Sequence, residues 1–92
     1  MSRLAERDRV LVVDDDAVIR GLVRDGLERE GFDVSDVADG ATALEVLAGN
    51  RPSLVILDVN LPARGGFDVL SAIRAGSNVP VILLTGRVSE ID

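Results

Sequence analysis

The sequence predicts an α/β fold built on a parallel sheet, and three observations carry this prediction. Short apolar runs of the kind that form buried strands recur along the chain, at residues 10–13, 54–57 and 79–84. The segments between these runs space their apolar residues as helices do. Each run also ends abruptly at a polar residue, as expected where a buried strand leaves the sheet. Strands that alternate with helices imply parallel pairing through right-handed crossovers, in the order β-α-β-α-β-α-β.

The spacing of the apolar residues changes at Ala17, and this change separates the first predicted strand from the first predicted helix. Residues 1–9 are mostly polar, and we expect them to form a short N-terminal arm before a strand over residues 10–13. From Ala17 the apolar residues recur at helical spacing until Gly31, and Asp16 is the expected N-cap. The charged residues on the other side of this helix are interpreted as a solvated face: Arg20, Arg24, Glu28 and Arg29.

The middle of the chain supplies two more strands and a helix. Residues 32–37 alternate loosely between apolar and polar side chains, which predicts a strand with one wetter face at a sheet edge. Asp39-Gly40 marks a turn, and residues 41–48 are predicted to form a short helix. The sequence Gly-Asn-Arg-Pro at residues 49–52 ends that helix and leads into the strand that finishes at Asp58.

The last third of the chain continues the alternation of predicted strands and helices. A loop over residues 59–65 is followed by a predicted helix over residues 66–74, which Gly76 closes. Residues 79–84 form the fourth predicted strand. Residues 87–92 are expected to begin a fourth helix that they are too few to complete.

Composition limits the classes of function. Ninety-two residues allow one small domain, and a net charge of −6 argues against a nucleic-acid surface. The absence of Cys and His excludes disulfides, thiolate chemistry and imidazole chemistry, and all ten basic residues are Arg. No apolar run reaches the length of a membrane span and the N-terminus does not resemble a secretory signal, so we expect a cytoplasmic protein without membrane contact.

Acidic residues gather where the predicted strands end. Asp14 and Asp15 follow the first strand, Asp58 ends the third, and Thr85 follows the fourth. In a parallel sheet these ends share one edge, so the side chains can converge. Carboxylates held close together repel one another, so either their pKa values rise or a cation neutralises them. Because the chain has no Lys or His, a divalent cation with oxygen ligands, Mg²⁺ or Mn²⁺, is the natural partner.

Each of these residues has a plainer interpretation when taken alone. The run from Asp14 to Asp16 can be a strand exit followed by a helix cap, and Asp58 can be a turn residue. Thr85 can be an ordinary strand-end hydroxyl, and Gly65-Gly66 a flexible turn without function. The functional interpretation is favoured only because several strand ends carry such residues in order.

Three segments together resemble the receiver domain of two-component response regulators. They are Val10-Leu-Val-Val-Asp-Asp-Asp, Leu54-Val-Ile-Leu-Asp-Val-Asn-Leu-Pro and Pro80-Val-Ile-Leu-Leu-Thr-Gly. The resemblance extends from Val10 to Gly86. It implies a CheY-like, flavodoxin-like doubly wound parallel sheet with strand order 2-1-3-4. It also implies that residues 1–92 are a single, partial receiver domain.

The resemblance assigns roles to the residues at the strand ends. Asp58 matches the phosphoacceptor, which takes a phosphoryl group from a histidine kinase or phosphotransfer protein. Asp15 matches the direct ligand of Mg²⁺ (or Mn²⁺), and Asp14 the acid that reaches the metal through water. Asn60 matches the residue whose backbone carbonyl binds the metal, and Thr85 the switch hydroxyl. The implied protein is a signalling domain that assists its own phosphorylation, rather than an enzyme.

The chain departs from the family at its C-terminal end. The family has five strands and five helices, whereas the fifth strand, its active-site Lys, its aromatic switch residue and the fifth helix are missing here. An uncovered fourth strand would be an apolar edge. We therefore expect either that the sequence is a fragment of a longer regulator or that the chain forms a homo-oligomer, through strand pairing at this edge or through domain swapping.

Three other functions compete with phosphoacceptor signalling. The missing Lys favours a degenerate receiver that acts as a non-catalytic dimerisation or protein-interaction module. A Mg²⁺-dependent phosphatase with an Asp nucleophile ranks low, because the segment from Asp14 to Val18 lacks the Thr expected after the nucleophile. Nucleotide binding ranks lower still, because the chain has no Gly-x-Gly-x-x-Gly after a strand and no Lys for a phosphate loop.

Overall fold

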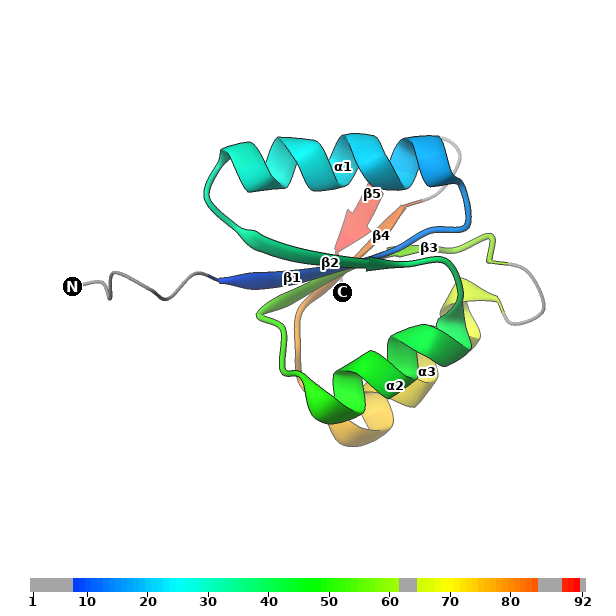
Figure 1. The fold of residues 1–92 in the computed structure, drawn as a ribbon. Helices are drawn as coiled ribbons and strands as arrows, with labels where there is room; N and C mark the ends of the chain where they lie inside the picture. The colour runs from blue at the N-terminus through cyan, green and yellow to red at the C-terminus, as the bar shows by residue number, and fades with distance from the viewer. Residues whose placement is uncertain (1–7, 62–64, 85–88, 92) are drawn as a thin grey trace.

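The computed structural model describes residues 8–61, 65–84 and 89–91, which form one five-stranded sheet between two layers of helices (Figure 1). The sheet order is β2-β1-β3-β4-β5. The strands are β1 (Arg9–Val13), β2 (Asp33–Val37), β3 (Leu54–Asp58), β4 (Val81–Leu84) and β5 (Ser89–Ile91). The helices are α1 (Ala17–Arg29), α2 (Gly40–Gly49) and α3 (Gly66–Gly76). No helix in the described ranges is long and apolar enough to cross a bilayer.

The first four strands are parallel, in the predicted order 2-1-3-4. The register sets Val13 of β1 beside Val37 of β2 on one side and beside Leu57 of β3 on the other. The residue after Val13 therefore leaves the sheet next to the last residue of β3. β2 lies at the sheet edge, as its alternating pattern predicted.

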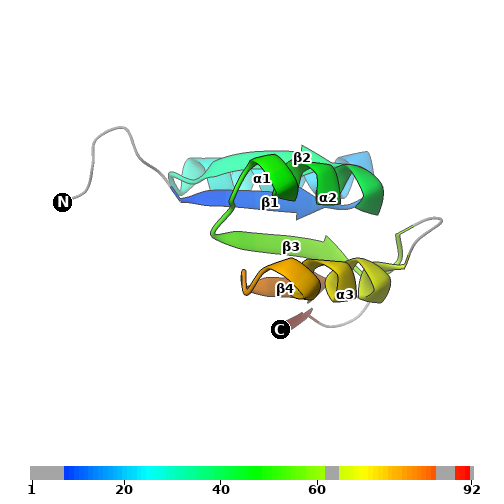
Figure 2. The same cartoon turned by 90° about the horizontal axis from the view of Figure 1, so that it is seen from below.

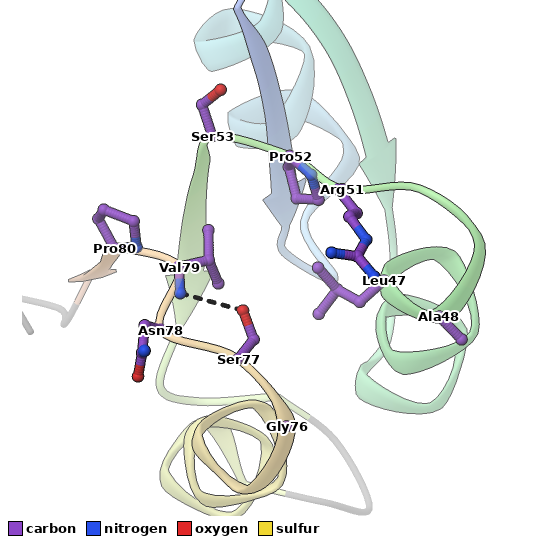
Figure 3. A pocket seen from close by; sticks show the side chains of 10 residues that line it. All are labelled: Leu47, Ala48, Arg51, Pro52, Ser53, Gly76, Ser77, Asn78, Val79 and Pro80. Atoms are coloured by element: carbon purple, nitrogen blue, oxygen red, sulfur yellow. Dashed lines mark hydrogen bonds between the residues drawn. The ribbon is translucent and has the colours of Figure 1, made fainter.

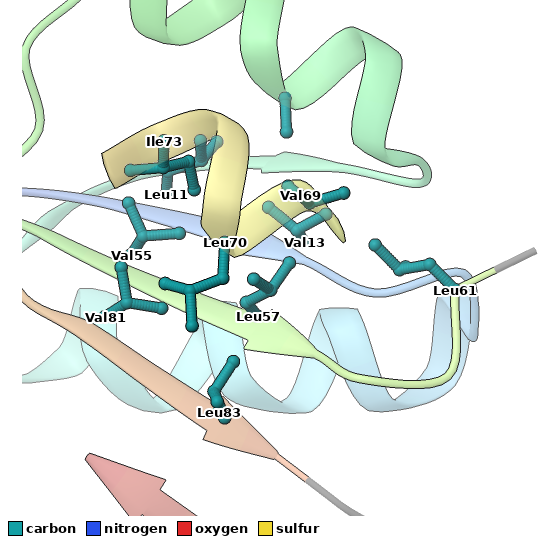
Figure 4. Close-up of a cluster of buried hydrophobic side chains, with 11 residues drawn as sticks. Leu11, Val13, Val55, Leu57, Leu61, Val69, Leu70, Ile73, Val81 and Leu83 are labelled. Atoms are coloured by element: carbon teal, nitrogen blue, oxygen red, sulfur yellow. The ribbon is translucent and has the colours of Figure 1, made fainter. Parts of the chain in front are cut away.

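The helices cover the two faces of the sheet unequally. Figures 1 and 2 show α1 on one face and the pair α2 and α3 on the other. The face under α2 and α3 holds the larger apolar cluster (Figure 4), formed by Leu11, Val13, Ala43, Val55, Leu57, Leu61, Val69, Leu70, Ile73, Val81 and Leu83. The cluster under α1 contains four buried residues, Val10, Val12, Val34 and Ile56. Because alternate side chains of a strand point to opposite faces, each buried strand feeds both clusters.

The ends of α1 follow the local chemistry of the sequence. The Asp16 carboxylate accepts hydrogen bonds from the N–H groups of Val18 and Ile19, so Asp16 is the predicted N-cap. Gly31, just after the helix, has a φ of +96°, a conformation in which glycine meets no Cβ penalty. This reversal directs the chain into β2.

One predicted element is wrong. Residues 87–92 were expected to begin a helix, but Ser89–Ile91 form β5, which pairs antiparallel with β4. Leu84 is paired with Ser89 and Ile82 with Ile91. The physical reason is the unpaired edge of β4, whose N–H and C=O groups gain partners when a short following segment folds back on them. The edge that the sequence suggested would be exposed is therefore covered by the chain itself.

Candidate functional site

Three carboxylates converge at the carboxyl ends of the two central strands. Asp14 and Asp15 follow β1, and Asp58 is the last residue of β3. Each offers one oxygen, and these oxygens all lie within 4.8 Å of one another. The parallel register of β1 and β3 accounts for this meeting, because it ends both strands at the same level. The sequence predicted this juxtaposition.

Asp14 is the most constrained member of the cluster. It is only 5% exposed, and it is the one buried charged residue in the described part of the chain. Its N–H donates to the carbonyl of Val37 on β2 at 3.1 Å. Its carboxylate Oδ1 accepts the N–H of Asp16 at 2.9 Å. Both the backbone and the side chain of Asp14 are therefore fixed before any ligand binds.

The surroundings of Asp14 disfavour its charge. Burial raises the pKa of the Asp14 carboxyl above its usual value of 3.8, and the nearby charges of Asp58, Asp15 and Asp16 raise this pKa further. The hydrogen bond from the Asp16 N–H works in the opposite direction, because it stabilises the carboxylate. The balance is a site that is too negative when empty, which is the electrostatic condition that favours a bound cation.

Asp58 is half-buried and its side chain is oriented by the loop that follows it. Its Oδ1 accepts the N–H of Asn60 at 3.1 Å. Val59, between them, donates its N–H to the carbonyl of Leu84 on β4 at 3.0 Å, which holds the start of the loop against the sheet. The second carboxylate oxygen, Oδ2, accepts no hydrogen bond from the described residues.

The donor set fits a hard divalent cation. Mg²⁺ and Mn²⁺ prefer carboxylate, carbonyl and water oxygens, and the three carboxylates present such oxygens at one edge of the sheet. Asp15 is exposed, as is Asn60, so water can complete the coordination. The residues present can therefore hold such an ion with a partly hydrated shell.

Sequence reasoning missed the supporting role of Arg20. It was interpreted as part of a solvated face, but only 21% of its side chain is exposed. Arg20 Nη1 donates to the Asp14 carbonyl at 2.8 Å, and Arg20 Nε donates to Asp36 Oδ2 at 2.9 Å. The position of Arg20, one turn after the strand exit, was the available signal, because a long side chain there reaches back to the strand end.

Gly66 was also underestimated, since it was interpreted as part of a flexible turn. Its N–H donates to the carbonyl of Val59 at 2.9 Å, and it is buried at the start of α3. A side chain at this position would meet the main chain of the loop that follows Asp58. Gly66 therefore allows α3 to pack closely beside the site.

Thr85, the expected switch hydroxyl, lies outside the described residues. The residue before it, Leu84, is paired with Asp58 in the register of β3 and β4. The roles predicted for Asp14, Asp15, Asp58, Asn60 and Thr85 remain predictions.

A separate cavity of about 530 Å³ lies at the other end of β3, between the connections that precede β3 and β4 (Figure 3). Arg51 is the one charged residue among the described residues that line it. Ser77 there accepts the N–H of Val79 at 3.0 Å and so serves its own loop. The cavity lies away from the acidic cluster and offers no carboxylates, so the candidate site is the cluster.

Comparison with known proteins matches this arrangement to one family. The family model described as "Response regulator receiver domain" matches residues 10–92. Among curated relatives, the DNA-binding response regulator MtrA of Mycolicibacterium paratuberculosis is 43% identical over 86 residues, which are 94% of this chain and 38% of that protein. The transcriptional regulatory protein CseB of Streptomyces avermitilis is 44% identical over 89 residues, which are 97% of this chain and 38% of that protein. The chain thus spans well under half the length of these relatives.

Solved structures agree with the fold. The chemotaxis protein CheY4 of Vibrio cholerae superposes with a TM-score of 0.86 at 35% identity, over 90% of this chain and 72% of that one. A response regulator receiver protein from Pseudomonas putida gives a TM-score of 0.83 at 31% identity, over 92% of this chain and 73% of that one. The β-α-β-α-β-α-β core is therefore the part of the fold that this chain shares with these proteins.

Proposed function

Because this chain belongs to the response regulator receiver domain family, we propose that its Asp58 accepts a phosphoryl group from the phosphohistidine of a histidine kinase or phosphotransfer protein. Mg²⁺ or Mn²⁺, bound by Asp14, Asp15 and Asp58, would be the cofactor. One observation carries the proposal: the oxygens of these three carboxylates lie within 4.8 Å of one another at the carboxyl ends of β1 and β3.

The reaction is a displacement at phosphorus. A carboxylate oxygen of Asp58 forms the new O–P bond while the N–P bond of the phosphohistidine breaks. The electron pair of the broken bond returns to the imidazole nitrogen, which takes up a proton from solvent. The Asn60 N–H donates to Oδ1 and so orients the carboxylate, and Oδ2, which accepts no hydrogen bond from the described residues, would be the attacking oxygen. A bound divalent cation would supply neutralisation of the charge on the phosphoryl oxygens.

The remaining roles complete the proposal. Asp15, which is exposed, would bind the cation directly, and the buried Asp14 would bind it through water. The backbone carbonyl of Asn60 would be a further ligand. Thr85 would donate its hydroxyl to the phosphorylated site and so report the change to the segment that follows.

Phosphorylation is tested with a small donor. The chain is incubated with Mg²⁺ and acetyl phosphate, and intact mass spectrometry should detect an added phosphoryl group that hydroxylamine removes, as expected for an acyl phosphate. D58N should abolish the adduct. D25N removes an exposed carboxylate from α1 and is the matched control, which should be phosphorylated like the unsubstituted chain. No adduct on the unsubstituted chain would reject the proposal.

A second candidate function is a non-catalytic interaction module. The observation that favours it is the outer face of α1, where Val18 is 70% and Leu22 65% exposed. Because β5 covers the edge of β4, self-association would use this face or domain swapping instead of strand pairing at β4. Light scattering that finds a dimer in the unsubstituted chain and a monomer in L22Q would support the module. A stable folded monomer in both would reject self-association.

A further inference from the structure

The backbone of Asp14 is fixed from both directions by neighbours on β2 and α1. Its N–H donates to the carbonyl of Val37, and its carbonyl accepts Nη1 of Arg20 at 2.8 Å. The carbonyl of Asp14 belongs to the peptide group that joins it to Asp15. Because a peptide group is planar, holding this carbonyl fixes the direction in which the chain enters Asp15.

Asp15 depends on this backbone for its position. Its carboxylate is exposed and has no hydrogen-bond partner in the described ranges, whereas Asp14 and Asp58 each accept a main-chain N–H. Nothing else among the described side chains directs the Asp15 carboxylate toward the other two. The hydrogen bond from Arg20 to the Asp14 carbonyl is therefore the described side-chain contact nearest to Asp15 along the chain that can bear on its position.

Arg20 is itself anchored. Its Nε donates to Asp36 Oδ2 at 2.9 Å, and both side chains are about four-fifths buried. Asp36 also accepts Arg24 Nη1 at 2.6 Å through its other oxygen. Asp36 offsets only part of the charge of Arg20, because it is also paired with Arg24, so a weak repulsion between this guanidinium and a cation at the site remains. Its planar fork donates to Asp36 from Nε and to the Asp14 carbonyl from Nη1, and an ammonium on a flexible stem lacks this fixed pair of donor nitrogens.

We propose that Arg20 is a positioning residue for the metal site: anchored by Asp36, it holds the Asp14–Asp15 peptide group and thereby aims the Asp15 carboxylate at the cation. The inference rests on the proposed metal-dependent function. It assigns a role to a residue that touches neither the phosphoryl group nor the metal.

If Arg20 acts as a nearby charge, its removal should change Mg²⁺ affinity in one direction, and if it acts by positioning, in the other. The inference is therefore testable. If Arg20 acted only as a nearby positive charge, its removal would strengthen cation binding. If it acts by position, R20A weakens Mg²⁺ binding even though a repulsive charge has gone. Outer residues that orient metal ligands typically change affinity by 10–100-fold, and we expect a loss of about tenfold here.

The measurement is isothermal titration of the full chain with Mg²⁺, repeated with Mn²⁺. R24A is the matched control, because Arg24 also extends from α1 to Asp36 but, among the described residues, donates no hydrogen bond to Asp14. R24A should bind both ions as the unsubstituted chain does. Amide NMR shifts of Asp15 and Asp16 should change in R20A before any metal is added.

A second variant protects the test against misfolding of R20A. R20K keeps the charge but replaces the two fixed donor nitrogens by a single ammonium on a flexible stem, so its Mg²⁺ affinity should also fall, by less than in R20A. Circular dichroism identifies an unfolded variant. If R20A is unfolded, the Mg²⁺ affinity of R20K alone decides the test. Folded variants that bind Mg²⁺ as tightly as the unsubstituted chain, or more tightly, would overturn the inference. An unsubstituted chain that binds neither ion would overturn the proposed metal-dependent function, and the inference with it.

Discussion

Gly66, at the start of α3, lies directly against the main chain of Asp58. A Cβ on Gly66 would lie 2.5 Å from the Asp58 carbonyl oxygen, closer than any side-chain carbon can approach. G66A should therefore lower the free energy of unfolding by about 1–3 kcal/mol, because either the loop after Asp58 or the start of α3 has to move. Chemical denaturation measures the loss. An unchanged midpoint would contradict the close packing of α3 on this loop.

The same substitution at Gly21 should have the opposite sign. Gly21 lies inside α1, and a Cβ there would meet nothing within 4 Å. Alanine restricts the unfolded chain and favours the helix, so G21A should raise the free energy of unfolding by about 0.5–1 kcal/mol. Denaturation of G21A and G66A side by side separates an open glycine from a packed one. Destabilisation by G21A would show that α1 packs against a further surface.

Asp14 gives the stability of the metal-free protein a specific dependence on pH. Burial, followed by the neighbouring carboxylates, raises the folded-state pKa of Asp14 above 3.8. The folded state then binds more protons than the unfolded state, so the contribution of Asp14 is present below pH 3.8 and is lost as the pH rises through the folded-state pKa. D14N, which keeps an oxygen acceptor for the Asp16 N–H, should be more stable than the unsubstituted chain at neutral pH.

The comparison with D14N is made by thermal melting in the presence of a chelator, at pH 7 and near pH 3. The advantage of D14N should shrink at the lower pH, where Asp14 is protonated in both states. D25N, on the exposed side of α1, is the control and should follow the unsubstituted chain. An advantage that grows on acidification would contradict the raised pKa.

The contribution of Asp39 to stability should depend on pH in the direction opposite to that of Asp14. It is the N-cap of α2, and hydrogen bonds from the Thr42 N–H and hydroxyl lower the pKa of its carboxyl. A lowered pKa contributes stability that is present above the unfolded value of 3.8 and is lost as the pH falls through the folded value. D39A should destabilise the chain at pH 7, while D39N keeps the cap and should lose less. Melting curves at several pH values test this. Equal effects of D39A and D39N would contradict the cap.

Added Mg²⁺ should stabilise the folded chain, because the carboxylate cluster exists only in the folded state. Binding to one site stabilises by RT ln(1 + [L]/Kd), about 2.7 kcal/mol at a hundred times Kd. D15N and D58N should lose most of the rise in melting temperature, and D25N should keep it. An equal rise in all four proteins would indicate nonspecific binding to this acidic chain.

The sequence was sufficient for the parts of the fold that depend on local pattern. The apolar runs that end at Asp14 and Asp58 determined which residues meet at the sheet edge, because parallel strands end at a common level. Asp16 and Gly31 likewise predicted the ends of α1. These signals are short-range, because each is contained in the residues of the element that it predicts.

The features that sequence reasoning missed depend on contacts between distant segments. The polar pattern of α1 does not distinguish Arg20, which folds back to Asp14 and Asp36, from the exposed Arg29. The segment after Thr85 has little intrinsic preference, and the open edge of β4 decides that Ser89–Ile91 becomes a strand. Glycine 66 carries no side chain from which a packing constraint could be inferred. In each case a tertiary partner decided the outcome.

The unequal faces of the sheet have a consequence for motion. In the described part of the chain, the cluster on the face of α2 and α3 has eleven buried residues, four of which belong to these two helices. The cluster under α1 has four buried residues, and no residue of α1 is itself buried. Elements with few buried contacts open locally at a lower free energy than the rest of a domain. Amide hydrogens of α1 should therefore exchange with solvent well before those of β1 and β3. Since α1 carries Arg20 and is capped by Asp16, each such opening should release the Asp14–Asp15 peptide group, and a bound cation should slow the exchange.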